Sequence, residues 1–86
     1  MKTLQEFTSF INGKVISEKE VLGNLVYVLR GLKDGFVSFG WFSEVNKIPY
    51  ANFIKVSPSE LENNSESEYI DVLYQNAEHT FISLKK

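Results

Sequence analysis

The sequence KDGFVSFGWF, residues 33–42, decides the predicted fold, because a turn signal is followed at once by a run of strand-forming residues. Asp34-Gly35 favours a tight turn, and the aromatic and β-branched residues after it predict a strand over residues 36–42. Side chains alternate between the two faces of a strand. Large apolar side chains are usually buried, so we expect one face to pack in the core, namely Val37, Phe39 and Trp41.

The opposite face of this strand offers two interpretations. Phe36 and Phe42 lie at its two ends, and the small residues Ser38 and Gly40 lie between them. Either another element covers the two rings, or they form an exposed aromatic patch of the kind that marks a binding site for a partner. The sequence leaves both possibilities open.

Residues 35–39, GFVSF, are similar to the last five positions of the octapeptide of the RNA-recognition motif. The first three positions of that octapeptide require a basic residue, a glycine and an aromatic ring. This chain has Leu32, Lys33 and Asp34 there. An acid in place of a base-stacking ring would repel phosphate, so we do not assign the chain to that family.

Two helices are predicted before the strand. Thr3-Leu4-Gln5-Glu6 fits a capping box, which favours a short N-terminal helix that ends at Asn12-Gly13. A strand over residues 7–11 with Asn12-Gly13 as a hairpin turn is the alternative. Ser17-Glu18-Lys19-Glu20 fits a second capping box, and four apolar residues recur after it at helical spacing. They predict the main helix, over about residues 18–31, and are Leu22, Leu25, Val26 and Leu29.

Three further strands are predicted after residue 42. One covers residues 51–56, and Ser57-Pro58-Ser59-Glu60 then signals a short helical turn. The other two, over residues 69–74 and 80–84, are expected to form a hairpin that turns at Asn76-Ala77. The predicted fold class is therefore α+β: one main helix and a short N-terminal helix packed on an antiparallel sheet of about four strands. The length of 86 residues fits a single compact domain over residues 1–86.

The composition excludes several kinds of site and several classes of protein. The chain has no cysteine, which excludes disulfide scaffolds, thiolate zinc sites and cysteine nucleophiles. No apolar run approaches the roughly 18–20 residues that span a bilayer. The polar pair Gln5-Glu6 interrupts the region where a signal peptide needs an apolar core. We therefore expect a soluble, cytoplasmic protein without a membrane partner.

Charge is distributed unevenly along the chain. Residues 1–55 contain seven Lys or Arg and five Asp or Glu, whereas residues 56–84 contain six acids and no Lys or Arg. Because electric fields follow local charge, the second segment is expected either to be a solvated loop or to form a negative patch that docks on a basic surface.

No motif indicates catalysis. The chain has one histidine, His79, and it lacks a glycine-rich phosphate loop, a paired-histidine helix and a nucleophile elbow. The acidic segment lacks the central glycine and the carboxylate order of a calcium loop. We therefore predict no enzyme activity, no cofactor and no metal site.

The function expected from these features is that of a small, non-enzymatic protein-binding module. It would be an inhibitor or accessory factor, phage- or mobile-element-like in general character, whose acidic patch docks on a basic protein such as a nucleic-acid-handling enzyme. The expected contact residues are Glu60, Glu62, Glu66, Glu68, Asp71, Phe42 and Tyr69.

Two alternatives belong to other classes. The first is a single-stranded nucleic-acid-binding domain that uses the aromatic strand 36–42 together with Lys33, Lys47 and Lys55. The second is a structural subunit of a homo-oligomer.

Overall fold

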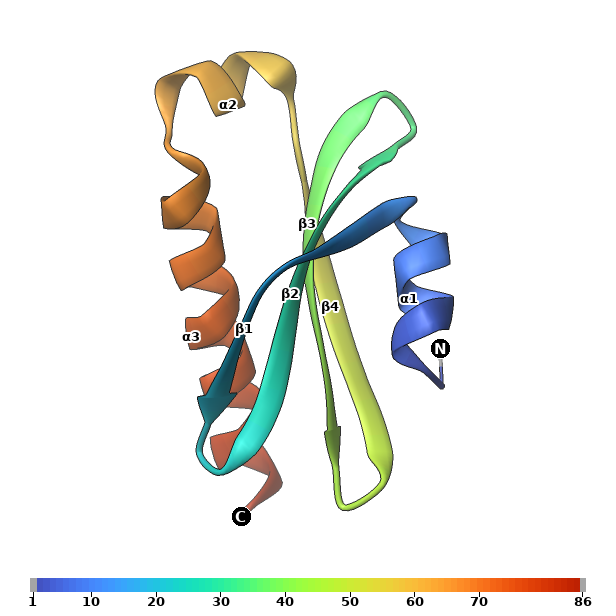
Figure 1. The fold of residues 1–86 in the computed structure, drawn as a ribbon. Coiled ribbons are helices and arrows are strands. Elements are labelled where there is room, and N and C mark those ends of the chain that lie inside the picture. The colour runs from blue at the N-terminus through green and yellow to red at the C-terminus, as the bar shows by residue number, and fades with distance from the viewer. Residues whose placement is uncertain (1, 86) are drawn as a thin grey trace.

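The structure, a computed structural model, describes residues 2–85 and has an α+β fold with a four-stranded antiparallel sheet (Figure 1). The strands follow one another across the sheet in the order β1-β2-β3-β4. Helix α3 lies along one face of the sheet and helix α1 lies on the other (Figure 1). The elements are α1 (Leu4–Phe10), β1 (Gly13–Val21), β2 (Asn24–Lys33), β3 (Phe36–Val45), β4 (Ile48–Val56), α2 (Pro58–Asn63) and α3 (Glu66–Leu84).

The prediction of a main helix over residues 18–31 is wrong, because these residues belong to the β1–β2 hairpin. The chain turns at Leu22 and Gly23, whose φ angles are 51° and 81°. Two consecutive residues with positive φ are the signature of a type I′ hairpin turn. The capping-box residue Ser17 is a strand residue whose hydroxyl lies 2.6 Å from that of Tyr74.

The helical spacing that supported this prediction arises because β2 is covered on both faces. Val26 packs against α3, whereas Leu29 packs against α1. A strand with two buried faces does not alternate cleanly between apolar and polar residues. The apolar residues of β2 therefore recur at a spacing that is typical of a helix, although they lie on both faces of the strand.

The predicted hairpin over residues 69–84 is also wrong, because these residues form most of the 19-residue helix α3. The buried residues of α3 are Leu73, Ala77 and Phe81, each four positions from the next. This spacing places them on one side of a helix. Asn76, expected in a turn, instead accepts a hydrogen bond from Trp41 Nε1 at 2.8 Å.

Two of the predicted helix starts are confirmed, one before the sheet and one after it. The short N-terminal helix is confirmed, and Thr3 caps it by accepting a hydrogen bond from the Glu6 amide at 3.1 Å. Ser57 caps α2 in the same way, through the Glu60 amide at 3.3 Å. The predicted strands 36–42 and 51–56 are confirmed within β3 and β4.

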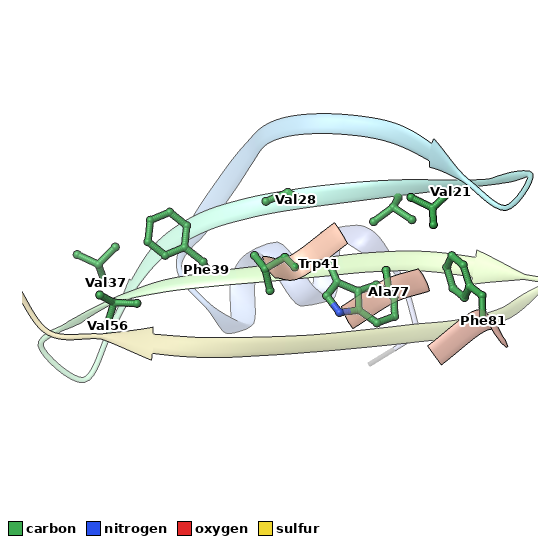
Figure 2. Packing of buried hydrophobic residues seen from close by; sticks show 10 residues of the cluster. Val21, Val28, Val37, Phe39, Trp41, Val56, Ala77 and Phe81 are labelled. Atoms are coloured by element: carbon green, nitrogen blue, oxygen red, sulfur yellow. The ribbon is translucent and has the colours of Figure 1, made fainter. Parts of the chain in front are cut away.

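The larger core lies between the sheet and α3, as Figure 2 shows. Val37, Phe39 and Trp41 are 8%, 0% and 1% exposed, so the predicted core face of β3 is confirmed. Its packing partner is α3 and not the predicted helix 18–31. The indole of Trp41 meets the ring of Phe81 edge to face, with 5.8 Å between the ring centroids.

The smaller core lies between the other face of the sheet and α1. It consists of Phe7, Ile11, Leu29 and Phe42. The Phe7 ring lies over Gly40, where an added Cβ would be 2.6 Å from Phe7 Cζ. The small residues between Phe36 and Phe42 therefore make room for α1, which covers Phe42 and leaves Phe36 41% exposed.

Candidate protein-binding surface

The acidic segment forms helices and not a loop. Glu60 and Glu62 lie on α2, and the remaining acids lie on α3. Glu66 and Glu68 are in the first turn of α3, where carboxylates interact favourably with the helix dipole. Ser65 at the N-cap makes no side-chain capping bond. The interaction of Glu66 and Glu68 with the helix dipole is therefore the side-chain contribution that stabilises the start of α3.

Two of the predicted contact residues help to fix α3 to the sheet. Glu66 accepts a hydrogen bond from Arg30 Nη1 at 2.9 Å. The Tyr69 ring stacks on Phe39, with 5.2 Å between centroids and 9° between planes. The Arg30 guanidinium lies 5.9 Å from the centroid of the same Phe39 ring. Glu66 and Tyr69 are therefore half-buried parts of the packing between helix and sheet.

Phe42 was expected to contact a partner, and the structure corrects the assumption that it is exposed. Its side chain is 2% exposed, and it stacks with Phe7 of α1 at a centroid distance of 6.3 Å. It also lies on the opposite face of the sheet from the acidic residues. A surface of α3 therefore cannot combine with Phe42 in one contact.

The outward side of α3 carries a line of acids. Glu68, Asp71 and Glu78 are exposed and follow one another at intervals of three and seven residues. At about 100° per residue these positions fall within an arc of roughly 80°. We call these three residues the acidic face of α3. The spacing was visible in the sequence, but Glu78 was missed because residues 69–84 were interpreted as a hairpin.

Two exposed apolar side chains accompany the acidic face of α3. Val72 is 52% exposed and Ile82 is 43% exposed. By helical geometry both point to the same outward side of the helix as the acids. The apolar side chains exposed beside the acids are therefore aliphatic, whereas Phe42 is buried and Tyr69 is half-buried.

A groove of about 380 Å³ separates α3 from the end of β1. Lys19 lines this groove, and its ammonium lies 5.4 Å from the centroid of the Tyr74 ring. Glu20 on the β1 side adds a further carboxylate to those of α3. The other lining residues are Val21, Leu22, Asp71, Tyr74, Gln75 and Glu78. Lys19 and Glu20 offset each other, so the negative charge of the groove comes from Asp71 and Glu78 of α3.

The basic residues of the nucleic-acid alternative lie on turns and strand ends. Lys33 donates to the Phe10 carbonyl at 3.2 Å, and Lys55 pairs with Asp34 at 2.9 Å. The hydrogen bond and charge of Lys55 lower the pKa of Asp34 below its usual value of 3.8. Lys47 occupies the β3–β4 turn. Phe36 is the exposed ring of strand 36–42, because Phe39, Trp41 and Phe42 are buried.

The described residues contain no group of three His, Asp or Glu side chains placed to hold a metal ion. Within the same part of the chain, no helix has the length and apolar character to cross a membrane. His79 is exposed on α3.

Comparison of the chain with protein-family models, with curated proteins and with solved structures finds no match.

Proposed function

We propose that the protein is a small, non-enzymatic protein-binding module, with the role of an inhibitor or accessory factor, and that the acidic face of α3 docks on a basic surface of its partner. The observation that carries this proposal is the alignment of Glu68, Asp71 and Glu78 on the exposed side of one helix. No Lys or Arg occurs between residues 56 and 84. The negative field of this side is therefore not offset along the helix itself.

The aliphatic side chains on the same side support the proposal. A purely charged surface gives steering and fast association, but affinity depends more on apolar contacts that are buried on binding. Val72 and Ile82 are each roughly half exposed and supply such contacts. The partner would bring Lys or Arg residues around a small apolar area.

The test is an affinity purification from the natural host with three forms of the protein. The first is the wild type, and the second is Asp71→Asn/Glu78→Gln, which leaves the first turn of α3 intact. The third is Glu6→Gln/Asp34→Asn, which removes the same charge from exposed positions outside α3. Circular dichroism checks that all three are folded.

The proposal predicts that wild type and control variant retain the same protein, and that the α3 variant retains much less of it. Equal retention by all three forms would contradict it. Retention of nucleic acid instead of protein would favour the nucleic-acid alternative. A multimeric mass in light scattering, unchanged by the α3 variant, would favour the homo-oligomer.

A further inference from the structure

The two faces of the sheet are covered to different extents. Helix α3 has 19 residues, which corresponds to about 28 Å, and the ten-residue strands β2 and β3 span about 33 Å. Helix α1 has seven residues, or about 10 Å. Figure 1 shows α3 along most of the length of the sheet and α1 beside a shorter part of it. The strands therefore extend beyond α1 on the face that α1 covers.

The register identifies the side chains on the uncovered part of this face. Opposite residues in an antiparallel pair share a face. Glu18, Tyr27, Phe42 and Ala51 are successive partners across the four strands. Glu20 pairs with Leu25, and Glu44 pairs with Pro49, in the next row. We call these two rows, on the side toward the β1–β2 and β3–β4 turns, the open end of the sheet.

The centre of the open end is apolar and hollow. Leu25 is 43% exposed, Tyr27 is half-buried and Ala51 is exposed. A hollow of about 300 Å³ lies between the first residue of α1 and the sheet. Its lining residues are Leu4, Leu25, Tyr27, Phe42 and Glu44. The hollow is large enough for an apolar side chain and has one carboxylate in its wall.

The rim of the open end is acidic. Glu18, Glu20 and Glu44 are all exposed, and the strand positions of the two rows contain no Lys or Arg. Lys47 lies beyond them, in the β3–β4 turn. A second copy of the chain on this surface would bring the two sets of carboxylates together, and like charges in apposition disfavour association. The charge pattern instead fits an occupant with a basic rim.

We infer that the open end of the sheet binds an amphipathic helix of a partner protein, which inserts a large aliphatic or aromatic side chain beside α1 and places Lys or Arg against Glu18, Glu20 and Glu44. Both faces of this sheet already pack against amphipathic helices, which is the usual way in which a sheet face is buried. The inference concerns the opposite side of the sheet from α3. It therefore holds or fails independently of the acidic face of α3, although both surfaces bind protein.

The test uses synthetic helical peptides as defined probes and maps their contacts by amide chemical shifts in NMR. The first peptide has leucines at i, i+3, i+4 and i+7 spacing flanked by lysines. The second has the same leucines flanked by glutamates. The third keeps the lysines and has serines in place of the leucines. We expect only the first peptide to shift the amides of β2 and β3 around Leu25, Tyr27 and Glu44.

Two variants on β2 test whether the peptide binds at the open end and not elsewhere on the strand. Leu25→Ser should weaken binding of the first peptide roughly threefold to tenfold, because 43% of this side chain is still open to burial by a partner. Leu32→Ser is the control, since Leu32 is 62% exposed on the opposite face of the same strand. It should leave the affinity unchanged.

The Asp71→Asn/Glu78→Gln variant separates this surface from the acidic face of α3. If the inference is correct, that variant binds the first peptide as the wild type does. Shifts that map to α3, equal effects of the two leucine substitutions, or equal binding of the glutamate-flanked peptide would overturn the inference. So would concentration-dependent shifts at the open end without peptide, since these would identify a second copy as the occupant.

Discussion

At the scale of single residues, Gly40 determines how closely α1 approaches the sheet. The Phe7 ring occupies the space that a side chain at residue 40 would fill. This contact buries Phe7 and Phe42 together, at 0% and 2% exposure. A glycine between two aromatic residues of a strand is thus explained by packing and requires no aromatic binding patch.

The substitution Gly40→Ala should lower the free energy of unfolding by about 1–3 kcal/mol, because it overpacks a filled core. Urea denaturation of the single and double variants measures this effect. In a Phe7→Ala background the same substitution should cost much less, since the ring that clashes with the new methyl group is gone. An equal cost in both backgrounds would show that Phe7 does not set the requirement for glycine.

The ion pair between Lys55 and Asp34 gives a pH-dependent prediction. Lys55 lowers the pKa of the Asp34 carboxyl in the folded protein below 3.8. A lowered folded-state pKa contributes stability at higher pH, and this contribution is lost as the pH falls through the folded-state value. Since both side chains are substantially exposed, the contribution to stability is small. The titration itself is the better observable.

An NMR titration of Asp34 should therefore give a pKa below 3.8, and Lys55→Met should raise that pKa toward 3.8. Lys47→Met is the control, because Lys47 belongs to a different turn. A titration of Asp34 at its ordinary value in the wild type would contradict the ion pair.

At the scale of elements, short-range signals predict the starts of α1 and α2 and the strand after Asp34-Gly35. Caps and turns depend on a few adjacent residues, but the same residues can occur elsewhere, as the capping-box pattern from Ser17 does in β1. The signal failed where burial depends on distant elements. β2 is covered by α1 on one face and by α3 on the other, and the residues of β2 alone do not indicate either of these contacts.

The same limitation applies to the candidate site. Charge alone identifies Glu66, Glu68 and Asp71 of α3 as candidates, but the alignment with Glu78 follows only from the correct secondary structure. Tyr69, Ile70 and Val72 favour strands by intrinsic propensity, and this obscured the four-residue spacing of Leu73, Ala77 and Phe81. Tertiary packing against the sheet outweighs that propensity in α3.

The β1–β2 hairpin offers a test at this scale. Leu22 has a φ of 51° and is 45% exposed, so a leucine occupies a left-handed turn position with little compensating burial. Asn-Gly is the preferred sequence for a type I′ turn. The substitution Leu22→Asn should raise the free energy of unfolding by about 1 kcal/mol in urea denaturation, because Asn adopts the left-handed conformation at a lower cost than Leu.

Stabilisation by Leu22→Asn is expected only if residue 22 lies in the turn of the β1–β2 hairpin. The substitution Leu25→Asn is a matched control, because Leu25 is 43% exposed within β2 and not in the turn. It should not stabilise the protein. A loss of stability in Leu22→Asn, as expected for Asn in the interior of a helix, would contradict the hairpin.

At the scale of the whole molecule, the sheet separates two surfaces of different character. The acidic face of α3 lies on the outside of the helix that packs on one sheet face, whereas the open end remains on the other face beside α1. The chain has a net charge of only −2, but exposed acids gather on each of these two surfaces. The proposal of a basic partner depends on this distribution, because local fields steer association.

The measurement that tests this account most directly is the salt dependence of affinity for the isolated partner. The dissociation constant is measured from low to high salt for the wild type, for Asp71→Asn/Glu78→Gln and for Glu6→Gln/Asp34→Asn. The account predicts that the α3 variant binds more weakly at low salt and loses affinity less steeply as salt is added, because exposed charge pairs are screened. Equal affinities and equal salt dependence in the α3 variant and the wild type would contradict docking through the acidic face of α3.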